Sequence, residues 1–108
     1  MTELYLAERF WPAGGLAELE AAASRLRGAA RSRPAGSAVG YLGSLLVPSD
    51  EVVFCLFRAE NPAAVVACNE RAAVALDRVV ACRGVPGEPT AAWSTPPAIR
   101  GDDRQANR

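Results

Sequence analysis

The sequence contains no histidine and no lysine, and all 12 of its basic residues are arginine. Without an imidazole, the chain cannot form a Ser/His/Asp triad or a Cys/His nucleophile pair by itself. Its 12 acidic residues balance the arginines, so the formal net charge is zero, and neither sign is gathered into a run. On electrostatic grounds, neither nucleic acid nor an anionic membrane is an expected partner.

Long apolar runs and paired cysteines are missing as well. No stretch approaches the roughly 18 apolar residues that a membrane span needs, and no charged leader precedes such a run. The 3 cysteines are an odd number without C-x-x-C spacing, which argues against a disulfide framework or a structural zinc site. We therefore expect a cytoplasmic protein in which Cys55, Cys68 and Cys82 are buried free thiols.

The length of 108 residues suits a single domain with one core. Apolar periodicity ends near Gly84, and the rest of the chain contains 4 prolines and only isolated apolar residues. We expect a domain over residues 1–84 and an extended or disordered tail over residues 85–108.

A stretch over residues 39–57 organises the predicted domain. Its two runs of β-branched and aromatic residues flank Pro48-Ser49-Asp50, which predicts an antiparallel hairpin in the middle of a sheet. The alternation over residues 4–11 predicts a first strand. We expect one parity of that strand to face the helices and the core, namely Leu4, Leu6, Glu8 and Phe10.

Two helices and a last strand complete the predicted order. From Leu16, apolar residues recur at spacings of three or four, which predicts an amphipathic helix of about four turns. Asn61-Pro62 is a typical helix start, and we expect this second helix to reach about Ala73. Residues 76–83 predict a fourth strand.

The resulting order, β-α-β-β-α-β, predicts an α+β ferredoxin-like fold with a four-stranded antiparallel sheet and both helices on one face. The other face would leave about eight apolar side chains in water, each worth roughly 1.5–3 kcal/mol. That sum rivals the whole stability of a typical domain. We therefore expect a symmetric homodimer, packed sheet to sheet.

Several segments resemble a family of small bacterial domains of unknown function. They are Tyr5-Leu-Ala-Glu-Arg9, Tyr41-Leu-Gly-Ser44, Val47-Pro-Ser-Asp-Glu51, Val53-Phe-Cys-Leu-Phe57, Asn69-Glu-Arg-Ala72 and Asp77-Arg-Val-Val80. The resemblance implies a ferredoxin-like dimer of the α/β-barrel type. It also implies nickel, or another divalent metal, because one member of that family has been described as a nickel-binding protein.

This sequence departs from the family in two respects. Nickel favours imidazole among nitrogen ligands, so a chain without histidine is expected to bind it weakly, through oxygen or thiol ligands. Asp50 and Glu51 are the metal candidates, but adjacent residues entering a strand point to opposite faces, so further ligands must come from the partner subunit.

The second departure is in the turn before the last strand. Where other members often have a Gly-x-Pro turn, this chain has Ala73-Val-Ala75, so its approach to Asp77 is expected to differ.

Candidate ligand-binding residues lie on the predicted sheet and second helix. Glu8, in a core-facing position, would be a desolvated general acid or base, or a ligand anchor; alternatively it pairs with Arg71 or Arg78, or lies at a strand end open to water. Cys55 is expected on the third strand, beside the first, where it lacks the base that a nucleophilic thiol needs.

Three polar residues, Tyr41, Asn69 and Arg71, interrupt elements that are otherwise apolar. In a pocket between sheet and helices they would orient a ligand. The alternative is that Tyr41 and Asn69 only bond neighbouring backbone.

The first functional hypothesis is a small dimer that binds a small molecule or a metal ion. The alternative, implied by related dimeric ferredoxin-like barrels, is a cofactor-independent monooxygenase, isomerase or cyclase acting on an apolar small molecule. A third hypothesis is a purely structural or regulatory dimer.

Overall fold

The computed structural model describes residues 2–32 and 38–85. Within them the predicted order of elements is confirmed: β1 (Glu3–Phe10), α1 (Leu16–Arg31), β2 (Val39–Val47), the 3-10 turn η1 (Pro48–Asp50), β3 (Val52–Ala59), α2 (Pro62–Arg71) and β4 (Arg78–Cys82). Apart from Val85, the tail expected over residues 85–108 lies outside the described residues.

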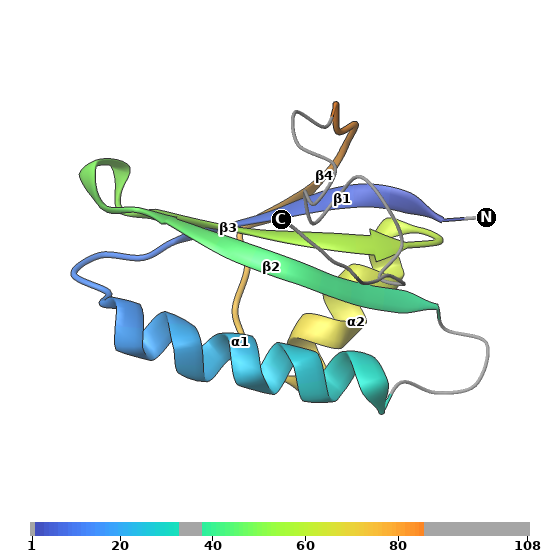
Figure 1. Ribbon diagram of the computed structural model, residues 1–108, viewed down its shortest axis with the longest axis horizontal. Coiled ribbons are helices and arrows are strands. Elements are labelled where there is room, and N and C mark those ends of the chain that lie inside the picture. The colour runs from blue at the N-terminus through green and yellow to red at the C-terminus, as the bar shows by residue number, and fades with distance from the viewer. Residues whose placement is uncertain (1, 33–37, 86–108) are drawn as a thin grey trace, which may run out of the picture.

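The four strands form one antiparallel sheet in the order β2-β3-β1-β4. Both helices cover the same face of this sheet (Figure 1). The α+β arrangement is compatible with a ferredoxin-like fold. The expectation that the hairpin forms the middle of the sheet is half wrong: β1 pairs with β3, so β3 is central and β2 is left at an edge.

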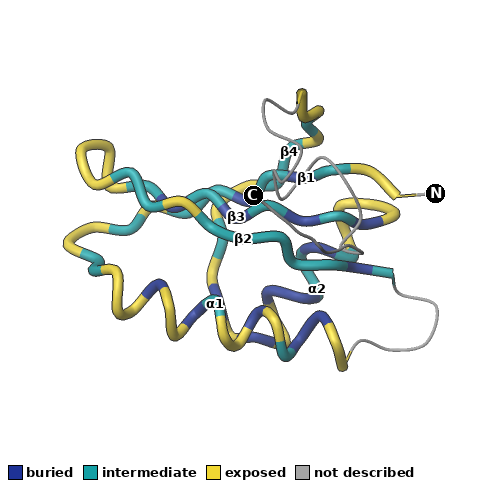
Figure 2. Tube along the Cα trace, in the orientation of Figure 1, coloured by how far each residue is buried: buried dark blue, intermediate teal, exposed yellow. Residues whose placement is uncertain are grey.

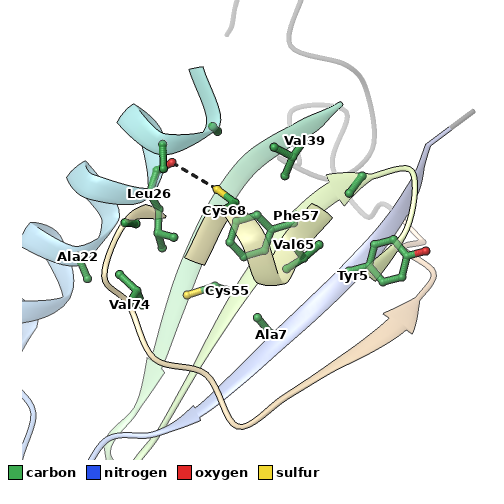
Figure 3. Close-up of a cluster of buried hydrophobic side chains, with 14 of the residues drawn as sticks. Tyr5, Ala7, Ala22, Leu26, Val39, Cys55, Phe57, Val65, Cys68 and Val74 are labelled. Carbon is green, nitrogen blue, oxygen red and sulfur yellow. Dashed lines mark hydrogen bonds between the residues drawn. The ribbon is translucent and has the colours of Figure 1, made fainter. Parts of the chain in front are cut away.

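The core fills the space between the sheet and the helices (Figure 2). Buried and half-buried residues alternate along β3, because successive side chains of a strand point to opposite faces. Phe57 of β3 is fully buried, with Leu26 of α1 and Val65 and Cys68 of α2 around its ring (Figure 3). Within the described residues, the core therefore lies on the helix side of the sheet.

Helix α1 has the apolar stripe that its spacing predicts. Leu19, Ala22 and Leu26 are buried, and the backbone N–H of Gly15 donates to Glu18 Oε1 at 2.7 Å, which caps the first turn. Leu16 was expected on this stripe, but it is 62% exposed, because it lies in the first turn, before the stripe meets the sheet.

The predicted start of α2 is confirmed. The Asn61 side chain accepts a hydrogen bond of 2.9 Å from the backbone N–H of Ala64, and Pro62 occupies the first helical position. The helix ends at Arg71, two residues before the expected end, and Ala73 follows in a left-handed conformation with φ +57°.

Strand β4 is shorter than predicted because residue Asp77 ties the chain to β1. Its backbone N–H donates to the Glu8 carbonyl at 2.7 Å, and its carboxylate accepts from the Phe10 N–H at 2.6 Å. These bonds fix the point at which β4 begins.

The predicted orientation of β1 is wrong. Tyr5 and Ala7 are buried beneath the helices, whereas Leu4, Leu6 and Glu8 point to the opposite side. Both parities of this strand carry apolar residues, so alternation alone could not choose between them. The pairing with β3 decides, because it sets Tyr5 opposite Phe57 and Ala7 opposite Cys55, both of which face the helices.

Candidate functional site

Two grooves flank strand β2. The first, which we call the helix-side groove, lies between α1 and β2 and has a volume of about 280 Å³. Its lining residues are Leu16, Leu19, Glu20, Ala23, Arg27, Tyr41, Leu42, Gly43 and Ser44.

The second, the open-face groove, lies on the side of the sheet turned away from the helices and has a volume of about 380 Å³. It is lined by Leu4, Leu6, Leu42, Gly43, Ser44, Leu45, Phe54, Leu56 and Gly84. Residues 42–44 line both grooves, so the two lie on either side of one short segment of β2.

That segment contains a β-bulge. Tyr41 is paired with Phe57 and Gly43 with Leu56, so Leu42 has no residue opposite it. Gly43 has φ +147°, which a residue with a side chain rarely adopts. Residues three apart on a regular strand face opposite sides, but the extra residue places Tyr41 and Ser44 on the same side, toward the helices.

The bulge thereby builds a chain of hydrogen-bonded side chains. Tyr41 Oη lies 2.5 Å from Ser44 Oγ, and the Ser44 hydroxyl donates to Cys55 Sγ at 2.9 Å. The Tyr41 ring is held against Phe57, with ring centroids 5.4 Å apart. Two predicted ligand-binding residues, Tyr41 and Cys55, are therefore brought together.

Sequence reasoning missed Ser44, the link between them. Its signal was the Tyr-Leu-Gly-Ser series itself, because a glycine between two polar residues of a strand can mark a bulge.

Burial keeps Tyr41 and Cys55, the two ends of this series of hydrogen-bonded side chains, protonated. Desolvation raises the pKa of the Cys55 thiol and of the Tyr41 phenol, and the hydrogen bonds to Ser44 only partly oppose this rise. To a lesser extent, the positive charge of Arg9 lowers the pKa of Cys55. That of Arg27 lowers the pKa of Tyr41. The side chains at neutral pH are thus a thiol and a phenol, and Cys55 is no activated nucleophile.

A third hollow, the interior cavity, lies between the sheet and the helices and measures about 10 Å³, which is room for about one water molecule. Cys55 and Asn69 both line it. The Asn69 amide donates to the Val65 carbonyl at 2.8 Å, so at least this part of its hydrogen bonding serves neighbouring backbone.

Two further residues of this cavity, Arg9 and Trp11, were not singled out in the sequence. The Arg9 guanidinium lies over the indole ring of Trp11, 4.3 Å from its centroid. The indole Nε1 is buried and has no hydrogen-bond partner within the described part of the chain. The reversed parity of β1 explains the omission, since it turns Arg9 and Trp11 to the helix side.

Glu8 lies on the open face, away from Tyr41 and Cys55. Its Oε2 is 2.8 Å from Arg78 Nη2, which confirms the ion pair expected as one alternative. This hydrogen bond is the main reason that the pKa of Arg78 is raised. The Arg78 side chain is 64% exposed and that of Glu8 is 25% exposed. The expectation that Glu8 faces the core and is desolvated there is therefore wrong.

Arg71 lies at the contact between the two helices. Its Nη2 donates to the Ala29 carbonyl of α1 at 3.0 Å, while Arg25 of α1 donates through Nε to the Ala72 carbonyl at 2.8 Å. These reciprocal bonds join the ends of α1 and α2. The structure therefore does not bring Arg71 together with the side chains of the bulge.

The metal candidates, Asp50 and Glu51, are exposed at the hairpin turn, where Glu51 has φ +54°. Over residues 2–32 and 38–85, no three His, Cys, Asp or Glu side chains lie close enough together to hold a metal ion. All three cysteines are free; Cys55 and Cys68 are buried as expected, while Cys82 is only half-buried.

Comparison of the chain with protein-family models, curated proteins and solved structures finds no match. Among the described helices, none is long and apolar enough to cross a membrane.

Proposed function

We propose that this chain is a small dimeric ligand-binding protein whose ligand lies in the helix-side groove. The observation that carries the proposal is the Tyr41–Ser44–Cys55 chain beside a groove lined largely by apolar residues. Leu16, Leu19 and Leu42 supply the apolar surface. An apolar cleft with a few convergent polar groups is the usual composition of a small-molecule site.

The proposed dimer uses the open face of the sheet and gives the α/β-barrel type of assembly. Its support is the open-face groove, whose walls include Leu4, Leu6, Phe54 and Leu56. A second copy would remove these side chains from water. Because Leu42 and Gly43 line both grooves, the ligand site would adjoin the subunit interface.

The family resemblance remains a proposal, and so does its nickel or other divalent metal. Asp50 and Glu51 are the two metal candidates at the hairpin turn. Two carboxylates are too few to hold a metal ion, so a metal bound there needs further ligands from the partner subunit. Calorimetric titration of the wild type and Asp50→Asn with nickel tests this part, and identical heats would contradict it. A cytoplasmic location is proposed from the free cysteines, which suit a reducing compartment.

A cofactor-independent enzyme is the second candidate, favoured by the protonated phenol of Tyr41. A phenol that stays neutral can donate a hydrogen bond to a substrate oxygen and so stabilise charge that develops there, and Ser44 and Cys55 lie behind it in the same series of hydrogen bonds. Conversion of a bound ligand into a chemically different product, separated by chromatography and lost in Tyr41→Phe, would distinguish this enzyme from a binder.

The ligand site is tested by filling the groove. Ala23 lines it, whereas Ala17 is exposed elsewhere on the same helix and serves as the control. With 1-octanol as a neutral probe, titration followed by amide NMR should shift signals of residues 16–27 and 41–44. Ala23→Leu should weaken binding at least tenfold because the added side chain occupies the groove, and Ala17→Leu should not. Shifts confined to the open face would contradict the proposed site.

A further inference from the structure

The helix-side groove has unlike charges at two separate points. The residues that α1 contributes, at positions 16, 19, 20, 23 and 27, share one side of the helix. Glu20 and Arg27 are two turns apart, about 10 Å along the axis. Leu16 lies one turn beyond Glu20, and so about three turns from Arg27. The groove therefore has a carboxylate among apolar side chains toward its Leu16 end and a guanidinium at its other end.

Tyr41 shares this groove with Arg27, whose guanidinium gives one end its positive charge. The charge of Arg27 opposes, as the smallest of several influences, the rise in pKa that burial of the Tyr41 phenol causes. Tyr41 and Arg27 both line the groove. A hydroxyl and a guanidinium thus line the same groove as Leu16, Leu19 and Leu42.

The hydrogen-bond chain can adapt to an anion at this end. As described, the Ser44 proton goes to Cys55 Sγ, so the Tyr41 hydroxyl donates to Ser44. If the Cys55 thiol instead donates to Ser44, and Ser44 donates to Tyr41, the phenol proton becomes free to point at a ligand. This reversal needs only rotations of hydroxyl and thiol hydrogens, which such groups make readily.

We propose that the helix-side groove takes a small amphipathic monocarboxylate. The carboxylate accepts hydrogen bonds from Tyr41 and Arg27, and the apolar body lies along Leu19, Ala23 and Leu42. The groove, with a volume of about 280 Å³, is far larger than the interior cavity of about 10 Å³ and has room for a molecule of that size. This inference rests on the proposed ligand-binding function and specifies its ligand class.

Three probes with the same eight-carbon chain test the class: octanoate, 1-octanol and octylammonium, each titrated at pH 7 by amide NMR. Octanoate should bind at least about tenfold more tightly than 1-octanol, since a hydrogen bond to a charged group contributes roughly 1.5–3 kcal/mol. Octylammonium should bind more weakly than octanoate, because Arg27 repels its charge at the end of the groove that holds the carboxylate, and tighter binding of octylammonium than of octanoate would overturn the carboxylate class.

Variants assign this preference to named groups. Arg27→Gln and Tyr41→Phe should each reduce the preference for octanoate over 1-octanol, and Glu20→Gln should strengthen octanoate binding by removing a repelling charge. Arg31→Gln is the matched control, since Arg31 is exposed on the same helix outside the groove. Its preference should equal that of the wild type.

The outcomes separate the two proposals. Equal binding of octanoate and 1-octanol in the groove would overturn the carboxylate class while leaving the ligand site intact. Binding of none of the three probes would overturn both. A preference for octanoate that survives Arg27→Gln and Tyr41→Phe would also overturn the assignment, because the anion would then be held elsewhere.

Discussion

Individual residues in unusual backbone conformations show where the chain is strained. Ala73 follows the end of α2 with φ +57°, in the left-handed region that costs an L-residue about 1–2 kcal/mol and that glycine tolerates. Its side chain is exposed, so few contacts depend on it.

Ala73→Gly should therefore raise the free energy of unfolding by about 1 kcal/mol, since it removes this strain. Urea unfolding of the whole chain measures the change. Ala75→Gly is the control, because Ala75 has no positive φ. There, glycine only increases the conformational entropy of the unfolded chain, which should lower the free energy of unfolding by roughly 0.4–1 kcal/mol. Equal changes in both variants would refute the argument from strain.

Single residues were also the scale at which sequence reasoning was least reliable. Cys55 was expected on the third strand, beside the first, and it lies there, opposite Ala7. Glu8 was assigned to the wrong side, because both parities of β1 are apolar and only the pairing with β3 distinguishes them. A one-residue shift reverses every side chain of a strand, so this information lies in the tertiary contacts.

At the scale of elements, the order and type of the helices and strands could be predicted from local signals. Asn61 and Pro62 begin α2 as expected, and the hairpin turns at Pro48–Asp50. The bulge in β2 was not predicted, because an extra residue is recognisable only from the register with β3. The candidate site depends on that bulge, so its residues were predicted in part and its geometry was not.

The contact between α1 and α2 gives a prediction at this scale. Arg71→Gln removes the bond to the Ala29 carbonyl and should lower the free energy of unfolding by roughly 1 kcal/mol, a modest loss because the arginine is exposed. Arg31→Gln on the last turn of α1 should change stability by less than about 0.5 kcal/mol, as most surface substitutions do.

Thermal unfolding and octanoate titration should be measured on the same samples. If Arg71 were instead a ligand-binding residue, binding would weaken while stability stayed unchanged. That result would contradict the structural role inferred from the two reciprocal arginine bonds.

At the scale of the whole molecule, the helices of residues 2–32 and 38–85 cover the sheet on one side only. Both helices lie against one face of the sheet (Figure 1). That face carries the buried Phe57 and Cys55, whereas Leu4, Leu6 and Phe54 line the groove on the other face. Apolar surface buried between two copies would have to outweigh the association cost of at least about 4 kcal/mol. The open-face groove is the place where that gain is available.

Leu45 and Leu16 allow a matched test of the proposed dimer. Their exposures are nearly equal, at 66% and 62%, but Leu45 lines the open-face groove and Leu16 lies at the start of α1. Leu45→Glu would bury a carboxylate in an apolar interface, which costs far more than leaving it in water. It should weaken association at least tenfold, whereas Leu16→Glu should leave it unchanged. Sedimentation equilibrium over micromolar concentrations measures both, and a wild-type mass of one chain throughout that range would refute the dimer. Equal weakening by the two substitutions would instead move the interface away from the open face.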